Sequence, residues 1–175
     1  MAWAPSVGQA TEKAWIAAGH RLPLSGHAYI SLNDRDKRRA GEIGRAFRDL
    51  GFELVATRGT AAALEAAGLE VRRVLNKVKE GQPDIVDAIA GGQVQLIVNT
   101  PLGRASRFDE NAVGRAALRY RVPMITTLSG AHAFARAIGA ARDGEPHVLS
   151  LQERLAAWGR PRGGTRPPEA LRGSR

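Results

Sequence analysis

The side chains of this protein that could do chemistry are hydroxyls, amides and lysines placed just after short apolar runs. The most informative example is Thr57-Arg58-Gly59-Thr60, which follows the run 52–56. A glycine between hydroxyl residues at the start of a helix lets backbone N–H groups and hydroxyls converge on an anion. The spacing therefore favours a phosphate site, although either threonine could instead serve only as a helix cap.

Four other apolar runs also end in polar residues. The residues that follow them are Ser31, Asn76 with Lys77, Asn99 with Thr100, and Thr126 with Thr127. In an open parallel sheet, ligands bind beyond the carboxyl ends of the strands, where the loops converge. If the runs are parallel strands, these side chains should share one binding edge.

Lysine is rare here, since only four of the 26 basic residues are lysines: Lys13, Lys37, Lys77 and Lys79. Lys37 and Lys77 fall at predicted strand exits, where a compact ammonium on a flexible stem can reach a phosphate. The alternative is that they are ordinary solvated surface lysines.

Catalytic combinations are few. The histidines His20, His27, His132 and His147 lack metal-ligand spacing and are expected to be packing or surface residues. Ser129 lacks the glycines of a nucleophile elbow and is predicted to cap the last helix of the sheet domain, while Asp84 and Asp87 are predicted only to favour a helix dipole. The absence of cysteine excludes thiolate chemistry. We expect no catalytic residues, no metal and no cofactor.

The elements that must position these residues alternate between β-prone runs and amphipathic helical patterns, which is typical of βαβ units. The predicted strands are 28–32, 52–56, 70–75, 94–98 and 122–126. The predicted helices are 36–50 with Asp34 available as a cap, 59–67, 84–90, 111–120 and 130–140. This pattern predicts an α/β fold, a three-layer Rossmann-like domain around a five-stranded parallel sheet.

The domain organisation follows from the same pattern. Residues 1–26 are predicted to form a connector with a short helix near 12–18, residues 27–153 the sheet domain, and residues 154–175 a tail rich in Arg, Gly and Pro. A closing helix is expected near 150–158, and the tail beyond it is expected to be disordered. Five arginines and one glutamate from residue 159 onward carry +4 of the formal net charge of +9, so a nucleic-acid role is disfavoured and would be confined to that tail.

Composition sets the class of protein. The 175 residues are 43% hydrophobic and 25% charged, as in an ordinary globular domain, and no apolar run is long enough to cross a bilayer. The first residues do not resemble a secretory signal, so a cytoplasmic location is expected.

Several of these segments resemble a known family. They are 52–60 (FELVATRGT), 74–78 (VLNKV), 80–85 (EGQPDI), 97–101 (IVNTP) and 126–128 (TTL), with a further likeness at 18–23. In order and spacing they resemble the methylglyoxal-synthase-like domain at the C-terminus of carbamoyl phosphate synthetase large chains. The likeness covers about residues 15–153.

The resemblance implies a regulatory domain that binds a nucleotide monophosphate such as UMP or IMP and acts on the other synthetase domains. It implies that Lys37, Thr57, Thr60 and Lys77, around the Gly59 turn, hold the phosphate, and that Ser31, Asn76, Asn99 and Thr100 complete the pocket. Thr126 matches a position that the family associates with ornithine.

Two residues depart from the family pattern. Pro101 stands where nucleotide-responsive members can carry a hydroxyl, which bears on the identity of the effector. Gln82 stands where methylglyoxal synthase has its catalytic aspartate, and an amide cannot act as a carboxylate base. The enzymatic alternative, a phosphate-eliminating enzyme of the methylglyoxal synthase type, would have to use Asp84 in its place.

Overall fold

The computed structural model describes residues 3–76, 78, 81, 84–101, 107–144, 146 and 148–158. For residues 107–110, 151, 154, 157 and 158 it describes the backbone alone. The predicted tail beyond residue 158 lies outside the described residues.

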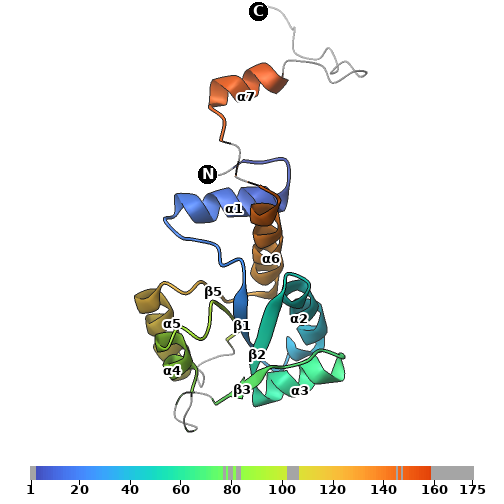
Figure 1. Ribbon diagram of the computed structural model, residues 1–175, viewed down its shortest axis with the longest axis vertical. Helices are drawn as coiled ribbons and strands as arrows, with labels where there is room; N and C mark the ends of the chain where they lie inside the picture. The colour runs from blue at the N-terminus through green and yellow to red at the C-terminus, as the bar shows by residue number, and fades with distance from the viewer. Residues whose placement is uncertain are drawn as a thin grey trace, which may run out of the picture.

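A five-stranded, all-parallel sheet in the order β3-β2-β1-β4-β5 forms the centre of the molecule (Figure 1). The strands are β1 (Gly26–Ser31), β2 (Phe52–Thr57), β3 (Arg73–Leu75), β4 (Leu96–Asn99) and β5 (Met124–Ile125). Their side chains are apolar on both faces, as expected of a parallel sheet covered by helices on both sides. The sequence prediction of the fold class is confirmed.

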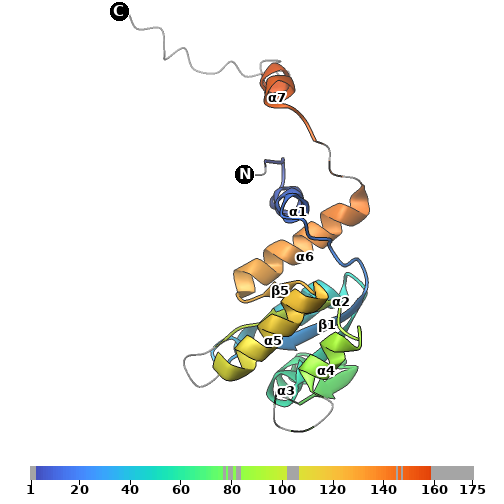
Figure 2. The same cartoon turned by 90° about the vertical axis from the view of Figure 1, so that its left-hand side faces the viewer.

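Two apolar clusters form the core, one on each face of the sheet. On one face, α2 (Ala40–Arg48), α3 (Arg58–Ala66) and α6 (Leu128–Asp143) pack against Ile30, Leu54 and Val98. On the other, α4 (Ile85–Ala90) and α5 (Arg107–Tyr120) pack against Tyr29, Val55 and Ile97. The two views of Figures 1 and 2 show these layers, with α4 and α5 together on one side.

The chain order changes direction between β1 and β4. From β1 the chain proceeds outward through β2 to β3, then returns across the sheet through α4 to pair β4 with the other side of β1. Ser31 at the end of β1 stands beside Asn99 at the end of β4. Such a switch point is where doubly wound sheets leave a crevice for a ligand.

The N-terminal helix α1 (Val7–Ala17) is longer than predicted and packs mainly on α6. The Trp15 ring meets Phe134 of α6 edge-on, with ring centroids 4.8 Å apart. A Cβ on Gly8 would stand 2.5 Å from the carbonyl oxygen of Arg136, so only glycine permits this approach.

The last helix, α7 (Leu151–Trp158), lies apart from the sheet in both views and spans the predicted domain boundary at residue 153 (Figures 1 and 2). Within the part of the chain that the structure describes, no helix has the length and apolar character needed to span a membrane.

Several element bounds differ from the sequence prediction for identifiable reasons. The fifth strand begins at Met124 instead of Val122, because the N–H of Val122 closes the end of α5 on Ala117 and Pro123 has no N–H to donate. The third strand begins at Arg73 because Leu69 still closes the end of α3 on Leu64. The predicted helix 36–50 is divided into a 3₁₀ turn, η1 (Lys37–Arg39), and α2.

Two predicted caps are wrong. Asp34 does not cap η1; the side chain of Asn33 instead accepts bonds from the N–H groups of Arg35 and Asp36. Ser129 does not cap α6, which begins two residues earlier than predicted and is capped by Thr127, whose Oγ1 accepts from the N–H of Gly130. Thr127 thus occupies the cap position of α6, whereas Asn33 stabilises the turn before η1, whose own N-cap residue, Asp36, makes no side-chain cap bond.

Candidate functional site

The polar residues at the strand ends lie along one edge of the sheet, as the strand order requires. Across that edge they run from Asn76 after β3, through Thr57 and Ser31, to Asn99 in β4 and Thr126 after β5. Ser31 and Asn99 are register partners, and the pairing of Ile30 with Ala56 places Ser31 and Thr57 at the same level. The edge is therefore continuous from β2 to β4.

Lys37 and Gly59 form the part of this edge best suited to an anion. The Lys37 Nζ atom lies against Gly59 so closely that a Cβ there would be 2.9 Å from it. Gly59 is in the first turn of α3, where backbone N–H groups lack intrahelical partners and carry the positive end of the helix dipole. The Lys37 ammonium therefore lies beside the exposed first turn of α3.

The threonines near this turn are buried and bond to each other and to the backbone. Thr57 donates its hydroxyl to Thr60 Oγ1 at 3.1 Å, and Thr60 Oγ1 also accepts from the N–H of Leu32 at 3.0 Å. Thr57, at the N-cap position, makes no side-chain bond to the first turn of α3. The two hydroxyls therefore attach α3 to the loop after β1 and do not satisfy the N–H groups of the helix start.

Thr100 has the matching role on the other side of β1. Its Oγ1 accepts from both the backbone N–H and the side-chain amide of Asn33, each at 3.1 Å, and its own N–H donates to the carbonyl of Ser31. Asn33 also donates to the Asp36 carboxylate at 2.7 Å. The loop that carries Lys37 is therefore held from both sides, by Thr60 and by Thr100.

Sequence reasoning missed Asn33, although it is the residue that joins the β1 loop to β4. The signal was present, because asparagine characteristically bonds to the backbone two residues downstream in turns. The adjacent Asp34 has the same capacity, and the sequence alone did not decide between them.

The other residues predicted for the site lie in the loop after β3 and at the ends of β4 and β5. Asn76 pairs with Asp84 through an isolated bridge that closes the base of the loop between them, and Lys77 in that loop lies outside the described residues, as does Gln82. Pro101 is exposed directly after the β4 end, and Thr126 is exposed at the far end of the edge, beyond β4.

The acidic alternative, Asp84, caps a helix. Its carboxylate accepts from the N–H of Asp87 at 3.0 Å, and the Asp87 side chain accepts from the N–H of Asp84, which makes a capping box at the start of α4. Both carboxylates are used in this local structure, in agreement with the predicted helix-start role.

The described histidines make separate packing and surface contacts. The His20 ring lies tilted against Trp15, with ring centroids 5.2 Å apart, His27 pairs with Glu53 at 2.9 Å, and His132 lies 3.8 Å from Glu42. Among the residues that the structure describes, no group of three or more His, Asp or Glu side chains is placed to hold a metal ion.

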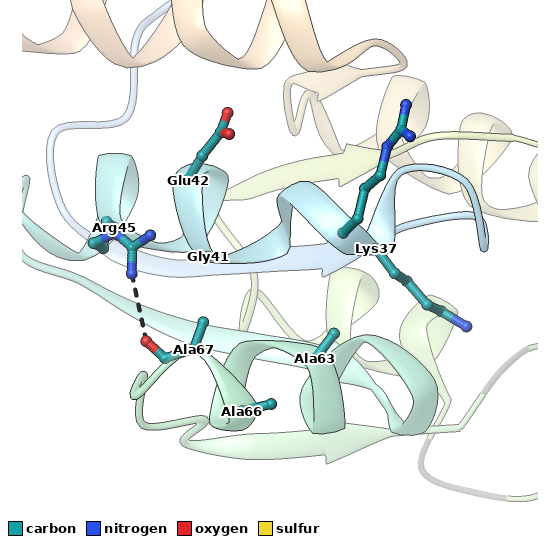
Figure 3. A pocket seen from close by; sticks show the side chains of 8 residues that line it. Lys37, Gly41, Glu42, Arg45, Ala63, Ala66 and Ala67 are labelled. Carbon is teal, nitrogen blue, oxygen red and sulfur yellow. Dashed lines mark hydrogen bonds between the residues drawn. The ribbon is translucent and has the colours of Figure 1, made fainter.

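A groove of about 410 Å³ adjoins the site between α2 and α3. Lys37 and Arg45 lie at its opposite ends, and the alanines of α3 form the side between them (Figure 3). Arg45 donates to the carbonyl of Ala67, and the Arg39 guanidinium, hydrogen-bonded to Glu42, lowers the pKa of that carboxyl. The groove therefore has a small-residue wall and a largely basic rim.

A family model matches a segment of the chain that contains part of this edge. The family model described as "MGS-like domain" matches residues 39–126, which include the helix start at Gly59, the β3 loop and the end of β4. This range is half of the chain.

The three similar curated proteins named here are longer than this chain. It is 51% identical to the carbamoyl phosphate synthase large chain of Rubrobacter xylanophilus over 87% of its own length and 14% of that protein. It is 50% identical to the "Carbamoyl phosphate synthase large chain, C-terminal section" of Methanopyrus kandleri, over 75% of this chain and 24% of that one. It is 46% identical to the arginine-specific chloroplastic large chain of Oryza sativa subsp. japonica, over 81% and 12%.

The chain thus spans a small part of the proteins that it matches. One of these proteins is itself a C-terminal section, which indicates that the matching part belongs to the C-terminal region of the large chain. From the family model, the parallel sheet and these relatives, the chain belongs to the MGS-like domain family.

Proposed function

We propose that this protein is the regulatory domain, or a fragment containing it, of a carbamoyl phosphate synthase large chain, and that it binds a nucleotide monophosphate such as UMP or IMP. The observation that carries the proposal is the position of Lys37 Nζ against Gly59 in the first turn of α3. A phosphate placed there would receive an ammonium and backbone N–H groups together.

The other residues of the edge have assigned parts in this proposal. Thr57 and Thr60 shape the phosphate turn, and each hydroxyl group sits within bonding distance of the other. Lys77, in the loop closed by Asn76 and Asp84, would bring a second cation to the phosphate. Ser31, Asn76, Asn99 and Thr100 would line the nucleoside side of the pocket. Thr126, level with Asn99 at the end of the neighbouring strand β5, would belong to a second, ornithine-type effector site.

The acidic residues Asp84 and Asp87 are consistent with a binding role without catalysis. Asp84, which a methylglyoxal synthase type of reaction would need as its base, is engaged in the capping box of α4. We therefore propose that the chemistry takes place elsewhere in a larger protein, and that this domain has no enzymatic activity alone.

The partners follow from the lengths of the relatives. Since the chain matches only 14% of a large chain, we propose that the remaining synthase domains are what it acts on. Regulation then requires the effector to bind more tightly in one state of the whole assembly than in another. A cytoplasmic location belongs to the same proposal.

Isothermal titration calorimetry of this chain tests the binding step, with UMP, IMP, AMP and inorganic phosphate as ligands and uridine as the control without phosphate. We expect saturable binding of at least one mononucleotide, weaker binding of phosphate and none of uridine. Loss of binding in Lys37→Ala, with binding retained in Lys13→Ala, would assign it to this edge. Absence of binding by every phosphate ligand would contradict the proposal.

A further inference from the structure

We propose that Asp34 is a gate at the anion site and sets the affinity for phosphate ligands by competing for the Lys37 ammonium. The inference rests on the proposed phosphate site and adds a residue to it. Asp34 has no role in the sequence pattern of the site beyond the helix cap that the structure does not show.

The competition follows from the position of one atom. Lys37 Nζ lies 2.6 Å from Asp34 Oδ1 and at the same time against Gly59. The Lys37 side chain is 31% exposed, whereas that of Asp34 is 86% exposed. The Lys37 side chain is thus partly buried, and its carboxylate partner is exposed to solvent.

The backbone turn that contains Asp34 is stabilised by the side chain of Asn33. The Asn33 side chain accepts from the N–H groups of Arg35 and Asp36, at 2.9 and 3.1 Å, and so fixes the turn in which Asp34 lies. Asn33 is in turn attached to Thr100. The fixed turn therefore holds the Asp34 carboxylate next to Lys37 before any ligand binds.

The charges predict the direction of the effect. A phosphate dianion at the start of α3 would share the ammonium with the Asp34 carboxylate, and the like charges of the phosphate and the carboxylate repel each other. The gate therefore lowers the occupancy of the site by any anion that has only the ammonium and the helix start to bind. A nucleotide that makes further contacts with the strand ends offsets this loss.

The test is calorimetric titration of the wild type and Asp34→Asn with inorganic phosphate, UMP and uridine. Asp49→Asn is the matched control, since Asp49 is also an exposed aspartate paired with a basic side chain, Arg48, but lies at the other end of α2. We expect Asp34→Asn to bind phosphate and UMP about fivefold more tightly at low salt, and Asp49→Asn to match the wild type. The gain should shrink in about 1 M NaCl, where the screening length is about 3 Å.

Asp34→Glu separates an effect of charge from a structural effect. If Asp34 acts through its charge, Asp34→Glu should bind phosphate about as tightly as the wild type, whereas Asp34→Asn should bind it more tightly. Wild-type binding with no gain in Asp34→Asn would overturn the gate and leave the phosphate site intact. Failure of both proteins to bind any phosphate ligand would overturn the proposed function as well, whereas binding by Asp34→Asn alone would support the gate.

Discussion

Asn33 and Thr100 join the two strands that flank the switch point of the sheet. The Thr100 hydroxyl oxygen accepts from the backbone N–H and the side-chain amide of Asn33, both at 3.1 Å. Asn33 begins the turn that leads to Lys37, and Thr100 directly follows β4. The position of the proposed phosphate-binding lysine thus depends on a residue 63 positions further along the chain.

The hydroxyl of Thr100 is therefore expected to matter for stability and for binding. Thr100→Val keeps the shape of a buried side chain, 5% exposed, but removes the acceptor of two bonds, which should destabilise the protein by about 1–3 kcal/mol. Thr100→Ser keeps the acceptor and should lose less stability. Urea denaturation followed by circular dichroism compares them, and equal midpoints for the two variants would contradict the assigned role of the hydroxyl.

Gly59 permits a test that separates binding from folding. A Cβ at this position would be 2.9 Å from Lys37 Nζ, at the end of a flexible side chain that can move away. Gly59→Ala should therefore displace the ammonium and weaken phosphate binding about tenfold or more, while the helix gains up to about 1 kcal/mol from the better helix former.

The matched control is Gly114→Ala in α5, where a Cβ meets no heavy atom of the described residues within 4 Å. Both variants should unfold at a higher denaturant concentration than the wild type, and only Gly59→Ala should bind phosphate more weakly. Equal phosphate affinities in the two variants, measured by calorimetry, would show that Lys37 is not held over Gly59.

Gly8 should determine how closely α1 packs on α6. Because a Cβ there would lie 2.5 Å from the backbone carbonyl oxygen of Arg136, Gly8→Ala must move one helix relative to the other, at a cost of about 1–3 kcal/mol. Hydrogen exchange of the α1 amides should become faster. Gly139→Ala in α6, whose Cβ would make only an ordinary contact with Leu50 at 3.9 Å, is the control and should leave the α1 amides unchanged.

The docking of α1 should weaken as the pH rises. Burial raises the pKa of Glu12 above its ordinary value of 4.5, and the nearby Lys13 offsets this only in part. The folded chain therefore binds this proton more tightly than the unfolded chain, so docking is most stable below about pH 4.5 and weakens as the pH passes the raised pKa.

Glu12→Gln removes the buried charge and should slow hydrogen exchange in α1 at pH 7, by an amount equivalent to about 1 kcal/mol. The benefit should disappear at pH 4. Glu65→Gln, at an exposed position of α3, should show no such pH-dependent difference. A Glu12→Gln effect of the same size at both pH values would rule out ionisation of Glu12 as its cause.

The sequence predicted what depends on local pattern. The alternation of β-prone runs and amphipathic helices predicted the parallel sheet, and the Pro83-Asp84 start and the Gly91-Gly92 end predicted α4. The continuity of the strand-end edge followed from the same alternation, because parallel strands must present their carboxyl ends on one side.

The local sequence pattern could not predict contacts between residues far apart in the chain. The bonds of Thr60 to Leu32 and of Thr100 to Asn33 join segments 28 and 67 residues apart, and they show that the threonines hold the β1 loop as well as lying at the site. The docking of α1 on α6 was equally hidden, because the buried position of an ionisable residue, Glu12, does not match an apolar stripe. Ser129 and Thr127 could not be distinguished as caps, since both are hydroxyl residues near the same helix start.

The most direct test of the phosphate site is a titration of the ¹⁵N-labelled chain with UMP and inorganic phosphate, followed through the backbone amide signals. We predict saturable shifts at Arg58, Gly59 and Thr60, where the helix start would receive the phosphate, and loss of these shifts in Lys37→Ala. Saturable shifts confined to other parts of the chain, or no shifts with either ligand, would contradict a phosphate site at the start of α3.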